Sequence, residues 1–182
     1  MKIEDKMIQL KDGRMCTLRS PRPEDALKAI EYMKITAGET DFLVRYPEEV
    51  RLSEEEERDF LQWNVGSPYH LLIIAEIDGE LIGTSSFSPA GGKMRTRHRC
   101  SMGIALVEKV WGQGIGSAMF EILFEKAKEV GYVQMELDVV ARNERAIALY
   151  EKMGFEKCGL KPRAFLQKDG TFDDEYFMVK LL

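Results

Sequence analysis

The stretch Leu106-Val-Glu-Lys-Val-Trp-Gly-Gln-Gly-Ile-Gly116 decides the fold of this chain. An apolar run, Met102 to Val107, precedes the glycines, and a long amphipathic pattern from Ile115 to Val130 follows them, so the order is strand, loop, helix. Glycines permit close approach of a ligand, and a helix start carries unpaired N–H groups and about half a positive charge. The stretch predicts a phosphate or pyrophosphate site. The alternative is that the glycines serve only a tight turn.

The totals indicate a globular protein of one domain, spanning residues 1–182. Hydrophobic residues make up 45% of the sequence, which is ordinary for such a protein. Cys16, Cys100 and Cys158 are odd in number and widely spaced, which favours a reducing, cytoplasmic setting. They form no metal-type pair and there are 2 histidines, so no metal is expected.

Charge and hydropathy argue against two classes of partner. The net charge is −5, and the densest basic cluster, Lys93 to Arg99, is short and lacks interleaved aromatic residues, so no nucleic acid is expected. No apolar run has membrane-spanning length, and Met1 to Leu10 does not resemble a signal peptide, so no membrane is expected either.

The first 64 residues predict a small hairpin and two helices. Met7 to Leu10 and Met15 to Arg19 flank a turn at Lys11-Asp12-Gly13. A helix is expected from Pro23 to about Ile35, with an apolar face formed by Ala26, Leu27, Ile30, Met33 and Lys34. Ser53 and Glu56 form a capping box for a second helix over about Glu54 to Asn64. Its four consecutive glutamates are expected to form a solvated face.

The remaining elements predict a mixed sheet. Strands over Tyr69 to Ile77, Leu81 to Ser88 and Arg97 to Val107 should form an antiparallel meander, with its first turn at Asp78-Gly79. Val133 to Val139 follows the long helix and should pair parallel through a right-handed crossover. A short helix begins at Asn143. The chain closes with a hairpin around Lys168-Asp169-Gly170 and a last strand over Tyr176 to Leu181. The fold class is α+β, a mixed, mostly antiparallel central sheet with helices on both faces.

The glycine loop matches two well-known phosphate-binding motifs poorly. The Walker loop requires Gly-Lys-Ser/Thr, and Gly116-Ser117 has no lysine. The dinucleotide fingerprint would use Gly112, Gly114 and an acid about twenty residues on, such as Asp138, but its third small residue falls at Ser117. Too few residues follow to complete a doubly wound sheet.

A third loop fits, together with a second segment. Trp111-Gly-Gln-Gly-Ile-Gly116 resembles the pyrophosphate loop Arg/Gln-x-x-Gly-x-Gly/Ala of the GNAT superfamily of acyl-CoA N-acyltransferases. Asn143-Glu-Arg-Ala-Ile-Ala-Leu-Tyr-Glu-Lys-Met-Gly-Phe155 resembles that family's Asn-x-x-Ala-x-x-x-Tyr-x-x-x-Gly-Phe. The resemblance covers about Met7 to Leu182 and is sharpest from Met102 to Phe155. The end of the chain resembles the closing hairpin of bacterial small-molecule members.

The resemblance implies acetyl-CoA as the acyl donor and a role for particular residues. Tyr150 would protonate the departing thiolate, and a core aromatic residue is the alternative. Asn143 would bind the pantetheine arm; a plain helix N-cap is the alternative, and both can hold at once. A backbone N–H near Leu106 would face the thioester oxygen. Trp111 replaces the arginine or glutamine of many members, which removes one phosphate contact. Pantetheine would lie against Ile104, Ala105 and Leu106. The pyrophosphate would be held by the N–H groups of Gly112, Gln113, Gly114, Ile115, Gly116 and Ser117.

The resemblance does not extend to the general base of the reaction. Several relatives place a glutamate about where Gly103 stands, and Gly103 cannot serve. The nearest replacements are Glu39, Asp41 and Asp138, and a water chain is the alternative. Cys100 is expected to be a buried, inert thiol. Direct attack in a ternary complex is therefore favoured over a covalent enzyme intermediate.

These features predict an acetyl-CoA-dependent N-acetyltransferase acting on the primary amine of a small molecule, such as an amino acid or amine metabolite. The alternatives are a protein N-terminal or lysine acetyltransferase and a non-catalytic acyl-CoA sensor. Acceptor-side residues should come from the two N-terminal helices, the Glu39–Leu43 loop and the final hairpin. A homodimer is common in the family that the sequence resembles, and the Trp63 region and the final hairpin are the candidate surfaces.

Overall fold

A computed structural model describes all residues from Met1 to Leu182 and contains a single eight-stranded sheet. The strand order is β1-β2-β3-β4-β5-β6-β8-β7, and only β5 and β6 pair in parallel. The strands are β1 Lys6–Gln9, β2 Met15–Arg19, β3 Leu71–Ile77, β4 Glu80–Pro89, β5 Arg99–Leu106, β6 Gln134–Val140, β7 Glu156–Leu166 and β8 Phe172–Leu181. The predicted α+β class, the meander and the parallel crossover are confirmed.

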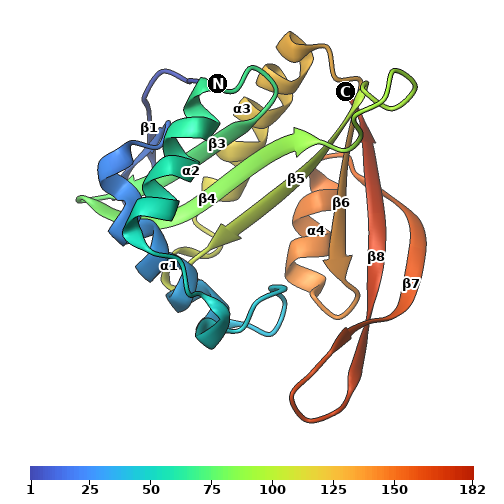
Figure 1. Ribbon diagram of the computed structural model, residues 1–182. Coiled ribbons are helices and arrows are strands. Elements are labelled where there is room, and N and C mark those ends of the chain that lie inside the picture. The colour runs from blue at the N-terminus through green and yellow to red at the C-terminus, as the bar shows by residue number, and fades with distance from the viewer.

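Four helices cover the two faces of this sheet (Figure 1). They are α1 Ala26–Glu39, α2 Glu54–Gly66, α3 Ile115–Val130 and α4 Glu144–Lys152. Helices α1 and α2 pack on one face, over β3 and β4, whereas α3 and α4 lie on the opposite face. Short 3-10 turns at Pro23–Asp25, Pro47–Glu49 and Glu108–Val110 complete the connections.

Helix α3 is the central packing element on its face. Its apolar stripe includes Met119, Phe120 and Leu123, which are fully buried. Phe120 packs edge-on against Tyr150 and Phe155, with ring centroids 5.9 and 5.8 Å apart. Gly131 ends the helix in the left-handed conformation, at φ 92°, as its position predicts. Cys100 is buried as expected, and burial raises the pKa of its thiol to about 12.

Strands β5 and β6 pair over a short length and then diverge (Figure 1). Their register partners are limited to Arg99–Ser101 with Gln134–Glu136, although β5 continues to Leu106 and β6 to Val140. Beyond Ser101, β5 pairs with β4 alone. The divergence leaves one edge of β5 unpaired in the middle of the sheet, directly before the glycine loop.

Two predictions about helix faces are wrong. Leu27, expected on the apolar face of α1, is 60% exposed, whereas the buried residues of that helix include Ala29, Ile30 and Tyr32. The four glutamates that begin α2 were expected to be solvated, but Glu57 is only 5% exposed. Glu57 shares the buried face of α2 with Leu61 and Asn64, at the four- and three-residue spacing of a helix face.

Tyr32 ties α1 to the middle of the sheet, which leads to a first prediction. Its hydroxyl donates to the carbonyl of Ala105 at 2.7 Å and accepts from the N–H of Thr84 at 3.1 Å. Replacing Tyr32 by phenylalanine removes both hydrogen bonds and should lower the free energy of unfolding by about 1–3 kcal/mol, at about 0.5–1.5 kcal/mol for each bond. Urea unfolding measures this change. Tyr69→Phe is the control, because the Tyr69 side chain is exposed, and equal losses in both variants would contradict the prediction.

Candidate functional site

The glycine loop presents a row of unpaired backbone donors. None of the N–H groups from Gly112 to Ser117 donates a hydrogen bond to another group of the protein, and the first bond of α3 runs from Ala118 to the carbonyl of Gly114. Gly112 and Gly114 have φ values of 76° and 97°, a region that side chains with a Cβ rarely occupy. The loop therefore leaves these N–H groups free at the positive end of α3.

Three elements converge behind this loop. A Cβ added to Gly116 would lie 3.0 Å from Cδ2 of Leu149 on α4 and 3.7 Å from Cδ1 of Ile104 on β5. Glycine here allows the close packing of α3, α4 and β5, because a Cβ would require the Leu149 side chain to shift. The predicted pantetheine residues Ile104, Ala105 and Leu106 are half-buried on the part of β5 that pairs with β4 but not with β6.

Side chains of the loop hold it in place. The indole Nε1 of Trp111 donates to the carbonyl of Leu106 at 2.7 Å, and the guanidinium of Arg145 lies 4.7 Å above its ring. Oε1 of Gln113 accepts from the N–H of Asp12 at 3.2 Å, across 101 residues of sequence. Both side chains anchor the loop to neighbouring elements. The contact uses the indole N–H of Trp111, whereas the amide nitrogen of Gln113 donates to no group of the protein.

Helix α4 carries the two residues predicted from the second segment. Oδ1 of Asn143 accepts from the N–H of Ala146 at 3.2 Å, which confirms the predicted N-cap, and its amide nitrogen has no acceptor in the protein. Tyr150 is 8% exposed, and desolvation raises the pKa of its phenol to about 12. The Tyr150 hydroxyl makes no hydrogen bond within the protein, yet it is not among the side-chain atoms cut off from solvent. This hydroxyl is a hydrogen-bond donor without a partner in the protein.

The carboxylates predicted as base candidates have other partners. Oε2 of Glu39 accepts from the N–H of Glu108 at 2.8 Å. Asp138 forms an exposed ion pair with Lys161 at 2.8 Å. Asp41 lies 3.8 Å from Arg142, whose guanidinium also binds Asp173 at 2.7 Å. None of the three is a free carboxylate beside β5.

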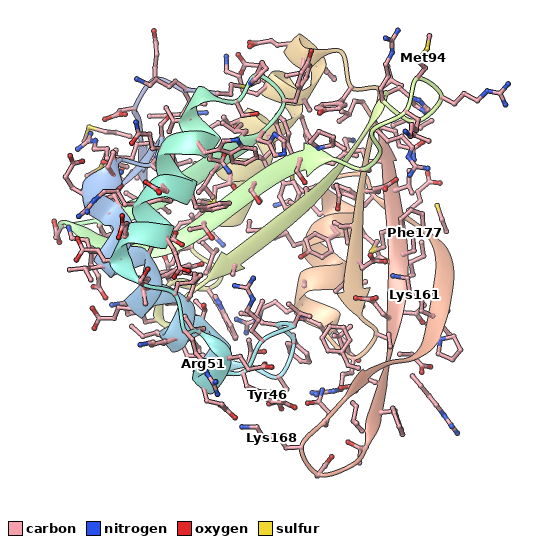
Figure 2. The ribbon with its side chains drawn as sticks, in the orientation of Figure 1. Tyr46, Arg51, Met94, Lys161, Lys168 and Phe177 are labelled. Carbon is pink, nitrogen blue, oxygen red and sulfur yellow. The ribbon has the colours of Figure 1, made fainter.

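The segments predicted for the acceptor side meet at the tip of the β7–β8 hairpin. The chain between α1 and α2 faces this tip, where Lys168 lies over the ring of Tyr46 at 4.2 Å (Figure 2). The hydroxyl of Tyr46 donates to Gln167 at 3.3 Å. A small cavity of about 40 Å³ separates the two segments, lined by residues 40–41, 43–46 and 165–167.

No three or more His, Cys, Asp or Glu side chains come together in a group that could hold a metal ion. None of the four helices combines the length and apolar character needed to cross a membrane.

The arrangement has the form of a site for a pyrophosphate-bearing ligand whose arm would run along the open edge of β5. Residues 38–155 match the family described as the acetyltransferase (GNAT) family. The match includes β5, the glycine loop, α3 and α4. This chain therefore belongs to the GNAT acetyltransferase family.

Solved structures and curated proteins agree with this assignment. The crystal structure of a GNAT acetyltransferase from Streptococcus pneumoniae is 29% identical, covers 92% of this chain and 99% of that one, and has a TM-score of 0.86. Neighbours at 18 to 24% identity share the fold and include structures with acetyl-CoA or coenzyme A bound.

Two curated relatives differ in what their names say they acetylate. The ribosomal protein bS18-alanine N-acetyltransferase of Escherichia coli is 36% identical over 34% of this chain and 41% of its own length. The L-methionine sulfoximine/L-methionine sulfone acetyltransferase of Pseudomonas paraeruginosa is 26% identical over 60% of this chain and 63% of its own length. The chain thus spans less than two thirds of the length of the curated relatives it matches.

Proposed function

We propose that this protein is an acetyl-CoA-dependent N-acetyltransferase that acetylates the primary amine of a small molecule by direct attack in a ternary complex. The observation that carries the proposal is the row of free N–H groups from Gly112 to Ser117, placed where β5 separates from β6. These donors would bind the pyrophosphate, and the open edge of β5 would receive the pantetheine arm.

Two side chains are proposed to act on that arm and its thiol. The free amide nitrogen of Asn143 would donate to pantetheine, while Oδ1 stays on the helix cap. Tyr150 would give its proton to the sulfur as the C–S bond breaks, and the backbone N–H near Leu106 would face the thioester oxygen. The buried thiol of Cys100 stays protonated at neutral pH, which supports direct attack over a covalent enzyme intermediate.

A small acceptor is favoured by the contacts around the acceptor side. The Tyr46–Gln167 hydrogen bond and the Arg142–Asp173 ion pair hold the chain between α1 and α2, the β6–α4 junction and the closing hairpin together. The relative named for methionine sulfoximine aligns over a larger share of this chain than the relative named for a ribosomal protein. Acetylation of a protein N-terminus is the second candidate, because the latter alignment has the higher identity.

Ligand binding gives the second prediction. Acetyl-CoA or CoA at about a hundred times its dissociation constant should raise the free energy of unfolding by about 2.7 kcal/mol, whereas NAD should leave it unchanged. Thermal unfolding with each ligand measures this effect. No shift with either CoA species would contradict the pyrophosphate assignment.

Turnover separates the two classes of acceptor. Free-thiol release from acetyl-CoA would be followed with a panel of amino acids and amines and, in parallel, with peptides that carry free N-termini. Faster release with a small amine than with every peptide is the expected result. The reverse order would favour the protein substrate.

A further inference from the structure

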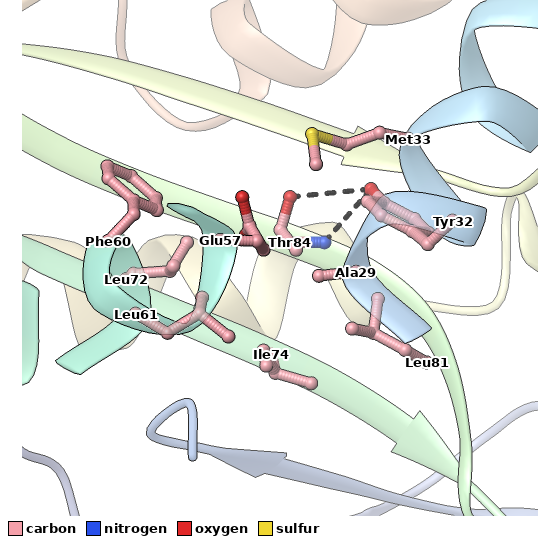
Figure 3. A pocket seen from close by; sticks show the side chains of 10 residues that line it. All are labelled: Ala29, Tyr32, Met33, Glu57, Phe60, Leu61, Leu72, Ile74, Leu81 and Thr84. Carbon is pink, nitrogen blue, oxygen red and sulfur yellow. Dashed lines mark hydrogen bonds between the residues drawn. The ribbon is translucent and has the colours of Figure 1, made fainter. Parts of the chain in front are cut away.

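A cavity between the N-terminal helices and the sheet contains a carboxylate for which the fold provides no partner. The cavity holds about 90 Å³ and is mainly apolar. It is lined by Ala29, Tyr32 and Met33 of α1, Glu57, Phe60 and Leu61 of α2, and Leu72, Ile74, Leu81 and Thr84 of β3 and β4 (Figure 3). A water needs about 10–15 Å³ of such a cavity, so the cavity can hold an amine head group together with water.

Glu57 is unlike the other glutamates of α2. Glu56 closes the capping box on Ser53, and Glu54 pairs with Arg58 at the surface, but no hydrogen bond or ion pair engages the buried Glu57 side chain. Its carboxylate points to the same side of the cavity as the Thr84 hydroxyl (Figure 3). This carboxylate lies among apolar side chains without a partner, which is unfavourable for folding, but its oxygens are not cut off from solvent, so water or a ligand can reach it.

The cavity adjoins the strand on which acetyl transfer is proposed. Thr84 is the register partner of Ala105, and Ser86 is that of Gly103, so Gly103 and Ala105 share the α1–α2 face of the sheet with the cavity. The Tyr32 hydroxyl bridges Thr84 and Ala105 directly. A Cβ on Gly103 would meet no atom within 4 Å, so the face of β5 beside the cavity is open.

We propose that Glu57 accepts a proton from the ammonium group of the acceptor amine, in the cavity beside β5. The proposal rests on the acetyltransferase function proposed above and supplies its missing base. An unpaired carboxylate in a low-dielectric cavity attracts an ammonium ion and accepts a proton when the amine attacks.

Glu57 and Tyr150 together account for the proton transfers of the reaction. The ammonium gives one proton to Glu57, and the freed nitrogen lone pair forms the C–N bond with the acetyl carbon. The C–S bond breaks, the sulfur takes its proton from Tyr150, and the second proton on nitrogen restores Tyr150. The proton on Glu57 leaves to solvent, so one proton is released in each turnover.

The groups around Glu57 allow it to titrate on its own. Desolvation raises its pKa above 4.5, and the charge of Arg45, in the chain between α1 and α2, opposes this shift. Tyr32 is the titratable group that α1 contributes to the cavity, and β3 and β4 contribute none. Asp25, on the 3-10 turn packed against α2, is held by Arg19 at 2.7 Å. The raised pKa brings Glu57 closer to the operating pH of a base.

The test is the third prediction and compares Glu57→Gln with Glu55→Gln, a matched change at an exposed position of the same helix. Glutamine keeps the shape of the side chain but cannot accept the proton. At pH 7, kcat/KM for the amine should fall about a hundredfold in Glu57→Gln and stay unchanged in Glu55→Gln. The shift of thermal unfolding by CoA should be the same in both variants and the wild type.

The pH profile separates a base from a structural residue. In the wild type, kcat/KM should level off above the pKa of Glu57. In Glu57→Gln it should keep rising about tenfold per pH unit toward the pKa of a free alkyl amine, about 10.4, because only the neutral amine then reacts. Glu57→Asp retains a carboxylate and should restore the plateau.

Stability gives an independent readout. Because the folded-state pKa of Glu57 is raised, its protonated form stabilises the fold at pH below 4.5, and this contribution is lost as the pH rises through the folded pKa. Glu57→Gln should therefore melt at the same or a higher temperature than the wild type at pH 7. Unchanged kcat/KM and pH profile in Glu57→Gln, with an active wild type, would overturn the base assignment alone. A wild type that binds CoA but acetylates no amine would overturn both proposals.

Discussion

Replacing Gly114 by valine is expected to weaken CoA binding by a hundredfold or more. Gly114 lies at φ 97° at the start of α3, and a Cβ there would project into open space beside the free N–H groups. Valine would both strain the loop and occupy the volume proposed for the pyrophosphate. Hydrogen bonds to charged groups contribute about 1.5–3 kcal/mol each, so displacing the phosphates from two donors should cost about 3 kcal/mol or more, roughly a hundredfold in affinity.

The other end of the same helix provides a matched control. Gly131 ends α3 at φ 92°, and a Cβ there would also meet no atom within 4 Å. Gly131→Val should therefore lose a similar amount of stability, because the backbone strain is alike. Its affinity for CoA, measured by isothermal titration calorimetry, should match the wild type. Equal losses of CoA affinity in both variants would show that the effect is one of folding, and the pyrophosphate site would then have to be placed elsewhere.

The parts of this site that sequence predicts are those set by local chemistry. Glycines before an amphipathic run, a cap at Asn143 and a terminal Gly131 each act within a few residues, and the structure contains all three features. The Ser53–Glu56 capping box is confirmed for the same reason. Such signals place the ends of α2, α3 and α4 without knowledge of the rest of the chain.

Features that depend on distant partners were not predictable in this way. The length over which β5 and β6 pair depends on the packing of whole layers, so the divergence after Ser101 has no signature in either strand. Strand β8 begins at Phe172, earlier than predicted, because β7 extends the pairing along the hairpin. The bond between Gln113 and Asp12 joins residues that no local pattern connects.

Glu57 shows most clearly that local sequence patterns do not predict features set by distant contacts. Four adjacent glutamates are chemically alike in the sequence, and only the contact of α2 with α1 and the sheet decides that Glu57 turns inward. The helical spacing from Glu57 to Leu61 and Asn64 is the one signal that could have separated it from its neighbours. If the base comes from α2 rather than from β5, position 103 of β5 does not need a carboxylate and can be glycine.

Replacing Tyr150 by phenylalanine should reduce kcat by about 10²–10⁴-fold while CoA affinity is retained. The phenol has a pKa of about 12 because α4 holds it in a desolvated position, so it stays protonated across the usual assay range. A thiol has a pKa of about 8.5, so complete transfer to a free thiolate is uphill by about 3.5 pKa units, or about 5 kcal/mol. Tyr150 should therefore act as the sulfur charge develops, with the proton replaced at once from the attacking nitrogen.

The same geometry predicts what the variant leaves unchanged. The Tyr150 hydroxyl makes no hydrogen bond within the protein, so its removal should not lower the free energy of unfolding, whereas the ring contacts with Phe120 and Phe155 remain. Thermal unfolding with and without CoA, together with single-turnover kinetics, separates these effects. A stable variant that binds CoA normally and has lost the chemical step would place Tyr150 at the leaving sulfur. Unchanged turnover would remove it from the reaction, and a wild type with no turnover to lose would leave an acyl-CoA sensor as the function of the fold.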